Sequence, residues 1–140
     1  MKFWDSSAVV CLAFVEPATP AMRAILESDP DIAVWWGTPV EFAAAAARKE
    51  RAGEATITVA NEAMARLRIM EDSWMSVPPS PRIRALAERI LRTHPLRAAD
   101  ALQLAAALAA AEEQPATLDF VCLDSRLAAA ARREGFPVLP

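Results

Sequence analysis

The sequence predicts an α/β protein in which a central, mostly parallel sheet of about four or five short strands is covered by helices on both faces. Short apolar runs alternate with longer segments of helical periodicity along the 140 residues, which is the order expected of successive β–α units. The apolar runs are continuous, as is typical of strands buried on both faces of a parallel sheet. Serine, threonine, proline and glycine mark the starts and ends of the intervening helices.

Five segments are predicted as strands. Residues Ile32 to Trp36 are mostly β-branched or aromatic, and Phe120 to Leu123 form an uninterrupted apolar run; both features favour strands. The other three are shorter: one precedes Asp5, one follows Ser73 and one follows Gly135. In chain order, the predicted strands cover residues 2–4, 32–36, 74–77, 120–123 and 138–139.

Seven segments are predicted as helices, most of them with a recognisable start or end. Ser6 and Ser7 can cap the first helix, and Thr38, which is followed by proline, opens the third. Gly53 ends the third helix, and Pro95 precedes the sixth. In chain order, the predicted helices cover residues 6–15, 20–27, 38–51, 58–70, 81–92, 96–113 and 127–133.

Size and composition indicate one globular domain spanning residues 1–140. The chain is 54% hydrophobic and 24% charged, which is globular rather than disordered composition. The apolar run from Leu104 to Ala111 is far shorter than the roughly 20 residues needed to cross a bilayer. Asp5, so close to the start, argues against a signal peptide. We therefore expect a cytoplasmic protein without a membrane partner.

The net charge of −3 argues against non-specific coating of nucleic acid, which usually requires a basic surface. It does not argue against a nuclease, because acidic residues in a metal site are offset by their cations. The chain has 18 acidic and 15 basic residues; without four site acids, 14 against 15 leaves +1.

Four acidic residues occupy positions suited to a common site. Asp5 and Asp124 directly follow predicted strands, and Glu41 lies about one helical turn past another. Ligands of open α/β sheets bind outside the carboxyl ends of the strands. Asp100 is a single charge near the start of a helix that is otherwise almost entirely alanine and leucine. Four carboxylates in one cleft would repel one another, and a hard divalent cation such as Mg²⁺ or Mn²⁺ would relieve that repulsion.

Each acid also has an ordinary structural explanation. Asp5 and Asp124 could be helix N-caps, and Thr38-x-x-Glu41 matches a capping box. Asp100 could favour the positive end of its helix. Other chemistry has less support, because the chain lacks nucleotide-binding glycine motifs and a GxSxG nucleophile motif.

The remaining candidates for site chemistry have simpler interpretations. The single histidine, His94, has no partner histidine for zinc, and we expect it to be structural. Cys11 and Cys122 lack CxxC spacing and are expected to be buried apolar thiols. Trp35 and Trp36 are expected to pack in the core, although exposed tryptophans can stack on bases.

Taken together, these motifs resemble the PIN domain, and most of all the bacterial and archaeal VapC toxins. The resemblance follows the whole chain in order and spacing. It rests on Asp5-Ser6-Ser7, on Glu41 after the second strand, on Leu96-Arg97-Ala98-Ala99-Asp100-Ala101-Leu102-Gln103-Leu104-Ala105, and on Phe120-Val121-Cys122-Leu123-Asp124-Ser125-Arg126-Leu127 with Gly135. One departure is Cys122, which stands where many members carry threonine.

The resemblance implies an endoribonuclease that uses Mg²⁺ or Mn²⁺, held by Asp5, Glu41, Asp100 and Asp124. It further implies RNA as substrate, a small VapB-like antitoxin as partner and a homodimer. Ser6 matches a hydroxyl that the family often carries near its first acid. From their positions within a turn of Asp100 and Asp124, Arg97 and Arg126 are expected to contact phosphate. The competing interpretations are a non-catalytic PIN-like binding module and a metal-dependent DNA nuclease or phosphatase.

Overall fold

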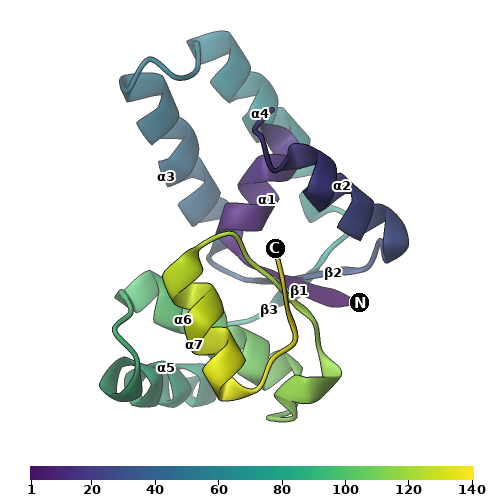
Figure 1. Cartoon of the computed structure of the whole chain (residues 1–140). Helices are drawn as coiled ribbons and strands as arrows, with labels where there is room; N and C mark the ends of the chain where they lie inside the picture. Colours follow the sequence, from purple (N-terminus) through teal and green to yellow (C-terminus); the bar gives the residue numbers. More distant parts are fainter.

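In the computed structural model, which describes all 140 residues, a five-stranded sheet lies between two layers of helices (Figure 1). All neighbouring strands pair in parallel, in the order β3-β2-β1-β4-β5. The predicted α/β class, with helices on both faces, is confirmed, and the arrangement is consistent with a PIN-like fold. The strands are β1 (Lys2–Trp4), β2 (Ile32–Trp35), β3 (Met75–Val77), β4 (Phe120–Val121) and β5 (Val138–Leu139).

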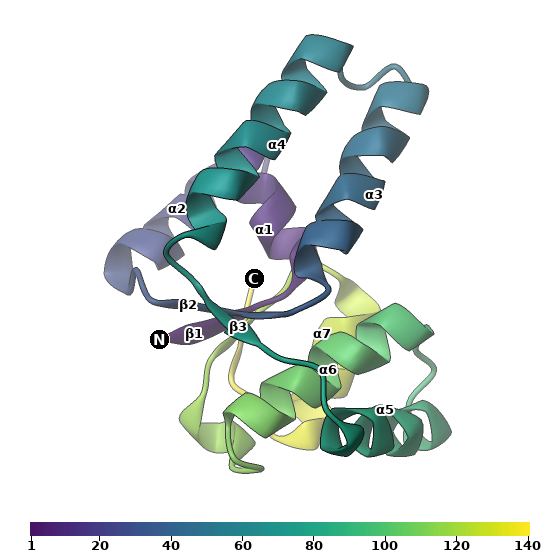
Figure 2. The same ribbon diagram turned by 180° about the vertical axis from the view of Figure 1, so that it is seen from behind.

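The helices divide between the two faces of the sheet. Four helices from the first half of the chain cover one face, and three from the second half cover the other (Figures 1 and 2). The helices are α1 (Ser6–Ala13), α2 (Thr19–Ser28), α3 (Thr38–Arg51), α4 (Ile57–Glu71), α5 (Pro81–Thr93), α6 (Ala98–Ala110) and α7 (Ser125–Glu134), with a short 3-10 turn at Pro115–Thr117.

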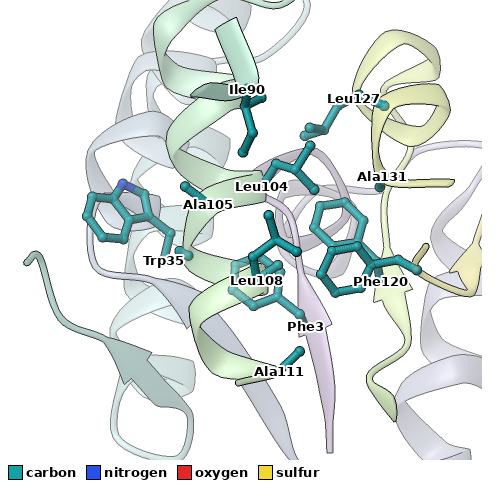
Figure 3. Close-up of a cluster of buried hydrophobic side chains, with 14 of the residues drawn as sticks. Phe3, Trp35, Ile90, Leu104, Ala105, Leu108, Ala111, Phe120, Leu127 and Ala131 are labelled. Carbon is teal, nitrogen blue, oxygen red and sulfur yellow. The ribbon is translucent and has the colours of Figure 1, made fainter. Parts of the chain in front are cut away.

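The alternation of side chains along each strand produces two separate cores. In β1, Phe3 packs with α5, α6 and α7, whereas Trp4 packs with α1 and α2; both are fully buried. Phe3 stacks on Phe120 of β4 with ring centroids 5.4 Å apart. Leu104 of α6 lies in the same cluster (Figure 3). Because both faces are covered, the strands can be apolar throughout, as the sequence shows.

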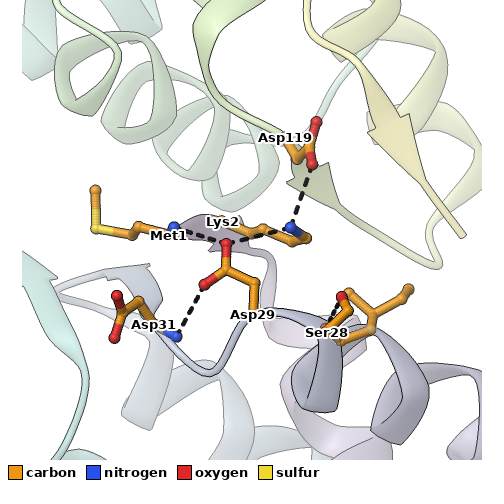
Figure 4. Close-up of polar contacts among 7 residues, drawn as sticks. Met1, Lys2, Ser28, Asp29, Asp31 and Asp119 are labelled. Atoms are coloured by element: carbon orange, nitrogen blue, oxygen red, sulfur yellow. Dashed lines mark hydrogen bonds and ion pairs between the residues drawn. The ribbon is translucent and has the colours of Figure 1, made fainter.

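Charged groups tie together the amino ends of the strands. The N-terminal amino group and the Lys2 ammonium both contact Asp29 Oδ2, at 2.7 and 3.2 Å, and Lys2 also pairs with Asp119 at 3.4 Å (Figure 4). These contacts join the start of β1 to the residues before β2 and β4. They occupy the opposite edge of the sheet from the carboxyl ends, where the acidic residues lie.

Several predicted boundaries are wrong by a few residues. The helix expected over 96–113 is α6, Ala98–Ala110: Arg97 is its extended N-cap, and Glu112 and Glu113 have positive φ values of 50° and 60°. The strand predicted over 120–123 ends at Val121, three residues before Asp124, the N-cap of α7. The first helix stops at Ala13 rather than at residue 15. Local propensity does not specify these ends, because capping and tertiary contacts decide them.

The aromatic, cysteine and histidine predictions have mixed outcomes. Trp35 is buried in the core as expected, but Trp36 is 58% exposed, because β2 ends before it and the chain turns into α3. Cys11 and Cys122 are buried free thiols. His94 is buried, with Nε2 2.8 Å from Glu134 Oε1, in a structural contact.

No helix in the structure combines the length and the apolar character needed to span a membrane.

Candidate active site

Asp5 is held in the turn between β1 and α1. Its side chain is only 3% exposed and caps α1, accepting a hydrogen bond from Ser7 N at 3.0 Å. The Ser7 hydroxyl also donates to Asp5 Oδ2, and it accepts a hydrogen bond from Leu123 N at 3.0 Å. One serine therefore joins the turn after β1 to the turn after β4, which brings Asp5 and Asp124 to the same edge of the sheet.

Asp124 caps α7 from an exposed position. Its Oδ1 accepts a hydrogen bond from Leu127 N at 2.8 Å. The N-cap interpretation is therefore correct for both Asp5 and Asp124. A cap and a ligand are not exclusive roles, because each carboxylate has two oxygens and several acceptor positions.

Glu41 does not form the capping box that its spacing from Thr38 suggested. Gly37 is the N-cap of α3, Thr38 is the first helical residue, and no side chain caps this end. Instead, Ser6 Oγ donates to Glu41 Oε2 at 2.8 Å, and Gln103 Nε2 donates to Glu41 Oε1 at 3.1 Å. Both carboxylate oxygens are held by partners from other helices, so Glu41 faces α1 and α6 rather than its own backbone.

Asp100 lies in the first turn of α6, after the N-cap Arg97. It is partly buried, and it makes no side-chain contact with a cation within ion-pair distance. The charges of Arg97 and Arg126 still act on its carboxylate and favour the ionised form. Asp100 therefore does more than place a charge at a helix start: it contributes a carboxylate to a region shared with other acids.

All four acids line one open cleft of about 740 Å³. Ser6 and Arg97 line it as well, so six of the seven predicted site residues share this space. Arg126 does not line the cleft, because it lies exposed in the first turn of α7 beyond the cap. Its charge still acts on Asp100 of the cleft, and its contact with phosphate stays a prediction.

The acids repel one another in a connected series. Burial raises the pKa of Glu41 to about 7, and the charges of Asp5 and Asp100 add to this rise. Burial also raises the pKa of Asp5, against the hydrogen bonds from Ser7, and Asp100 contributes to the rise. Burial raises the pKa of Asp100, and Asp124 raises it further. Each acid thus acts electrostatically on at least one other acid of the cleft.

Cys122 is a buried residue that lies next to Asp5. Its Sγ lies 3.7 Å from Asp5 Oδ2 and 3.4 Å from the Asp124 carbonyl oxygen. Burial raises the pKa of the thiol, and the Asp5 charge adds to the rise. The thiol is therefore a weak donor beside Asp5, in the position where a threonine would place a stronger hydroxyl donor.

The cleft offers oxygen ligands, which suit a hard divalent cation. However, no group of three or more Asp, Glu, His or Cys side chains is arranged to hold one metal ion. Asp5, Glu41 and Asp124 each direct one oxygen to a protein donor, and a carboxylate has further acceptor positions. The chemistry of these oxygen donors fits Mg²⁺ or Mn²⁺.

Sequence reasoning missed two residues of the site, Ser7 and Gln103. The sequence indicates a capping role for Ser7, whereas its hydroxyl bridges Asp5 and Leu123 in the structure. Gln103 lies three residues after Asp100, and thus on the same side of α6; it is completely buried. The available signal was a lone amide in a run of alanine and leucine, which requires a polar partner when it is buried.

No protein-family model matches the chain, and no curated protein matches it in sequence.

Proposed function

We propose that this protein is a metal-dependent endoribonuclease and the toxin of a VapBC-type toxin–antitoxin pair. The observation that carries the proposal is the series of four mutually repelling carboxylates around one cleft, at the carboxyl ends of β1 and β4. Such a series is costly without a cation and is chemically suited to one. The resemblance of the acid-bearing segments to PIN domains supplies the reaction class.

Asp5, Glu41, Asp100 and Asp124 would hold Mg²⁺ or Mn²⁺. When bound, the cation would polarise the scissile phosphate and lower the pKa of water, which is the chemistry that hydrolysis requires. The residues of the chain prepare this site: Ser7 fixes Asp5, while Ser6 and Gln103 fix Glu41. Ser6 thus supports the site through Glu41, in addition to any contact it makes with substrate.

Two acids are candidates for orienting the attacking water. Asp124 is exposed to solvent, whereas Glu41 is partly buried and held by two donors. A carboxylate that is free of direct ligation can accept the proton of that water. Arg97 lines the cleft and can bind a phosphate oxygen pair through its planar guanidinium.

The proposal includes protein partners and a cytoplasmic location. A small antitoxin and a second copy of the chain require apolar contact surfaces. The protein exposes several large apolar side chains on α3 and α4, namely Val40, Ile57, Val59 and Ile69. These two helices form a hairpin that extends away from the sheet (Figure 2). Light scattering of the purified chain tests the homodimer, and co-purification of a small protein encoded by a neighbouring gene tests the antitoxin.

The decisive experiment is incubation of the purified chain with total cellular RNA, with and without Mg²⁺. We expect cleavage only with the metal and loss of cleavage in Asp100→Asn. Asp72→Asn is the matched control, because Asp72 is exposed and does not line the cleft. Parallel reactions with single-stranded DNA test the DNA-nuclease alternative, and inactivity on both polymers would support the non-catalytic binding module instead.

A further inference from the structure

The cleft continues past the acids along one side of α3. Glu41, Ala44, Ala45 and Arg48 all line it, and their i, i+3, i+4, i+7 spacing places them on one helical face. Seven residues correspond to about 10 Å along the helix axis. The cleft is therefore elongated, with carboxylates near the start of α3 and a guanidinium near its end.

The two cations at this far end differ in their partners. Lys49 forms an ion pair with Glu16, pairs with Glu54 at 3.7 Å and lies over the Phe14 ring. Glu16, which lines the cleft as Lys49 does, also accepts a hydrogen bond from the Cys11 thiol at 2.8 Å, so its carboxylate has two partners within the protein. Arg48 is exposed and forms no ion pair or side-chain hydrogen bond. Its positive charge is the one left available to a ligand.

The floor between the acids and Arg48 is built from small or apolar side chains. Ala44 and Ala45 of α3 line the cleft together with Val10 and Cys11 of α1. Two alanines leave space that larger side chains would fill. An apolar floor with an acidic site at one end and a free guanidinium at the other matches a nucleotide strand, whose sugars and bases alternate with phosphates.

We propose that Arg48 binds a phosphate of the RNA strand that flanks the scissile phosphate, with the adjoining nucleotide lying over Ala44 and Ala45. This inference rests on the proposed function, because it assigns the orientation of the same substrate. The acids and Arg97 serve the scissile phosphate, and Arg48 serves a neighbouring one about two helical turns away. The strand therefore runs along α3, between α3 and α1.

The test measures RNA binding separately from cleavage. A fluorescein-labelled RNA decamer of randomised sequence is titrated in EDTA by fluorescence anisotropy, against wild type, Arg48→Ala and Arg51→Ala. Arg51 is the matched control, because it is exposed on the same helix but does not line the cleft. We expect Arg48→Ala to weaken binding about tenfold at low salt, and Arg51→Ala to change it less than twofold. The slope of log affinity against log salt should fall by about 0.7 for Arg48→Ala.

Ala44→Leu gives a second, charge-neutral test. Leucine preserves helix propensity and fills the floor of the groove, so it should also weaken binding of the decamer without lowering the melting temperature. Equal affinities and equal salt slopes for Arg48→Ala and Arg51→Ala would overturn the inference, while Mg²⁺-dependent cleavage by wild type would leave the proposed function intact. Unchanged RNA binding by Ala44→Leu would also overturn the placement of the adjoining nucleotide over this floor.

Discussion

Gln103 Nε2 lies 3.1 Å from Glu41 Oε1, and this hydrogen bond joins α6 to α3 across 62 residues of sequence. Gln103 is completely buried; its amide nitrogen also lies 3.3 Å from Thr38 Oγ1, and its Oε1 has no partner. A buried amide with an unsatisfied oxygen does not favour stability. We therefore interpret Gln103 as a residue that positions Glu41 for the site.

Gln103→Leu should separate positioning from stability. The substitution removes the donor to Glu41 together with the unsatisfied oxygen, so the melting temperature should change little. Mn²⁺ affinity, measured by electron paramagnetic resonance, should fall about 10- to 100-fold, as is typical when the hydrogen-bond partner of a metal ligand is lost. A variant that melts well below wild type while binding Mn²⁺ equally would show that Gln103 is purely structural.

The repulsion among the acids predicts that metal stabilises the protein. Millimolar Mg²⁺ or Mn²⁺ should raise the melting temperature, because a ligand that binds only the native state adds to its stability. Asp100→Asn should remove most of this gain. It should also raise the stability of the metal-free protein, because Asp100 disfavours ionisation of both Asp5 and Glu41. Differential scanning fluorimetry in EDTA and in metal measures both effects, and a melting temperature indifferent to metal would contradict the proposed site.

Glu41 predicts a pH dependence of stability. Its pKa is raised from 4.5 to about 7 in the folded protein, so the native state binds the proton more tightly than the unfolded state. Its contribution is neutral below pH 4.5, becomes destabilising as pH rises from 4.5 to 7, and stays destabilising above pH 7. Glu41→Gln should therefore stabilise the metal-free protein at pH 8 by about 2 kcal/mol, after allowance for partial exposure.

The comparison must be made at two pH values. At pH 4 the two proteins should melt at nearly the same temperature, because Glu41 is then protonated and glutamine can maintain contacts to Ser6 and Gln103. Chemical denaturation at pH 4 and pH 8 in EDTA gives the free energies of unfolding. A difference that is the same at both pH values would mean that charge at position 41 is not the cause.

The layers of this fold and most of the proposed site residues can be predicted from the sequence alone. Continuous apolar strands separated by capped helices required a parallel sheet covered on both faces, and the strand ends located Asp5 and Asp124. The partners of the acids were harder to predict. Nothing near Glu41 indicates that Ser6, 35 residues earlier, would hold it, and the local Thr38 spacing favoured a different contact. Such pairings depend on how helices pack across the sheet, which local patterns do not encode.

The boundary between structural and catalytic roles can be tested at Asp124, because this residue caps α7 and lines the cleft. Asp124→Ala should lose the hydrogen bond to Leu127 N, at a cost of about 1 kcal/mol, together with RNA cleavage. Asp124→Asn should maintain the cap, since asparagine is as good an N-cap as aspartate, yet still lose most cleavage, because an amide is a poor ligand for a hard cation. Asp100→Ala should lose cleavage with unchanged or higher stability, because it removes a charge that disfavours ionisation of Asp5 and Glu41. Melting temperature and Mg²⁺-dependent RNA cleavage, measured on all three variants, distinguish the two roles. Wild-type cleavage by Asp124→Asn would leave Asp124 a helix cap and remove it from the metal site.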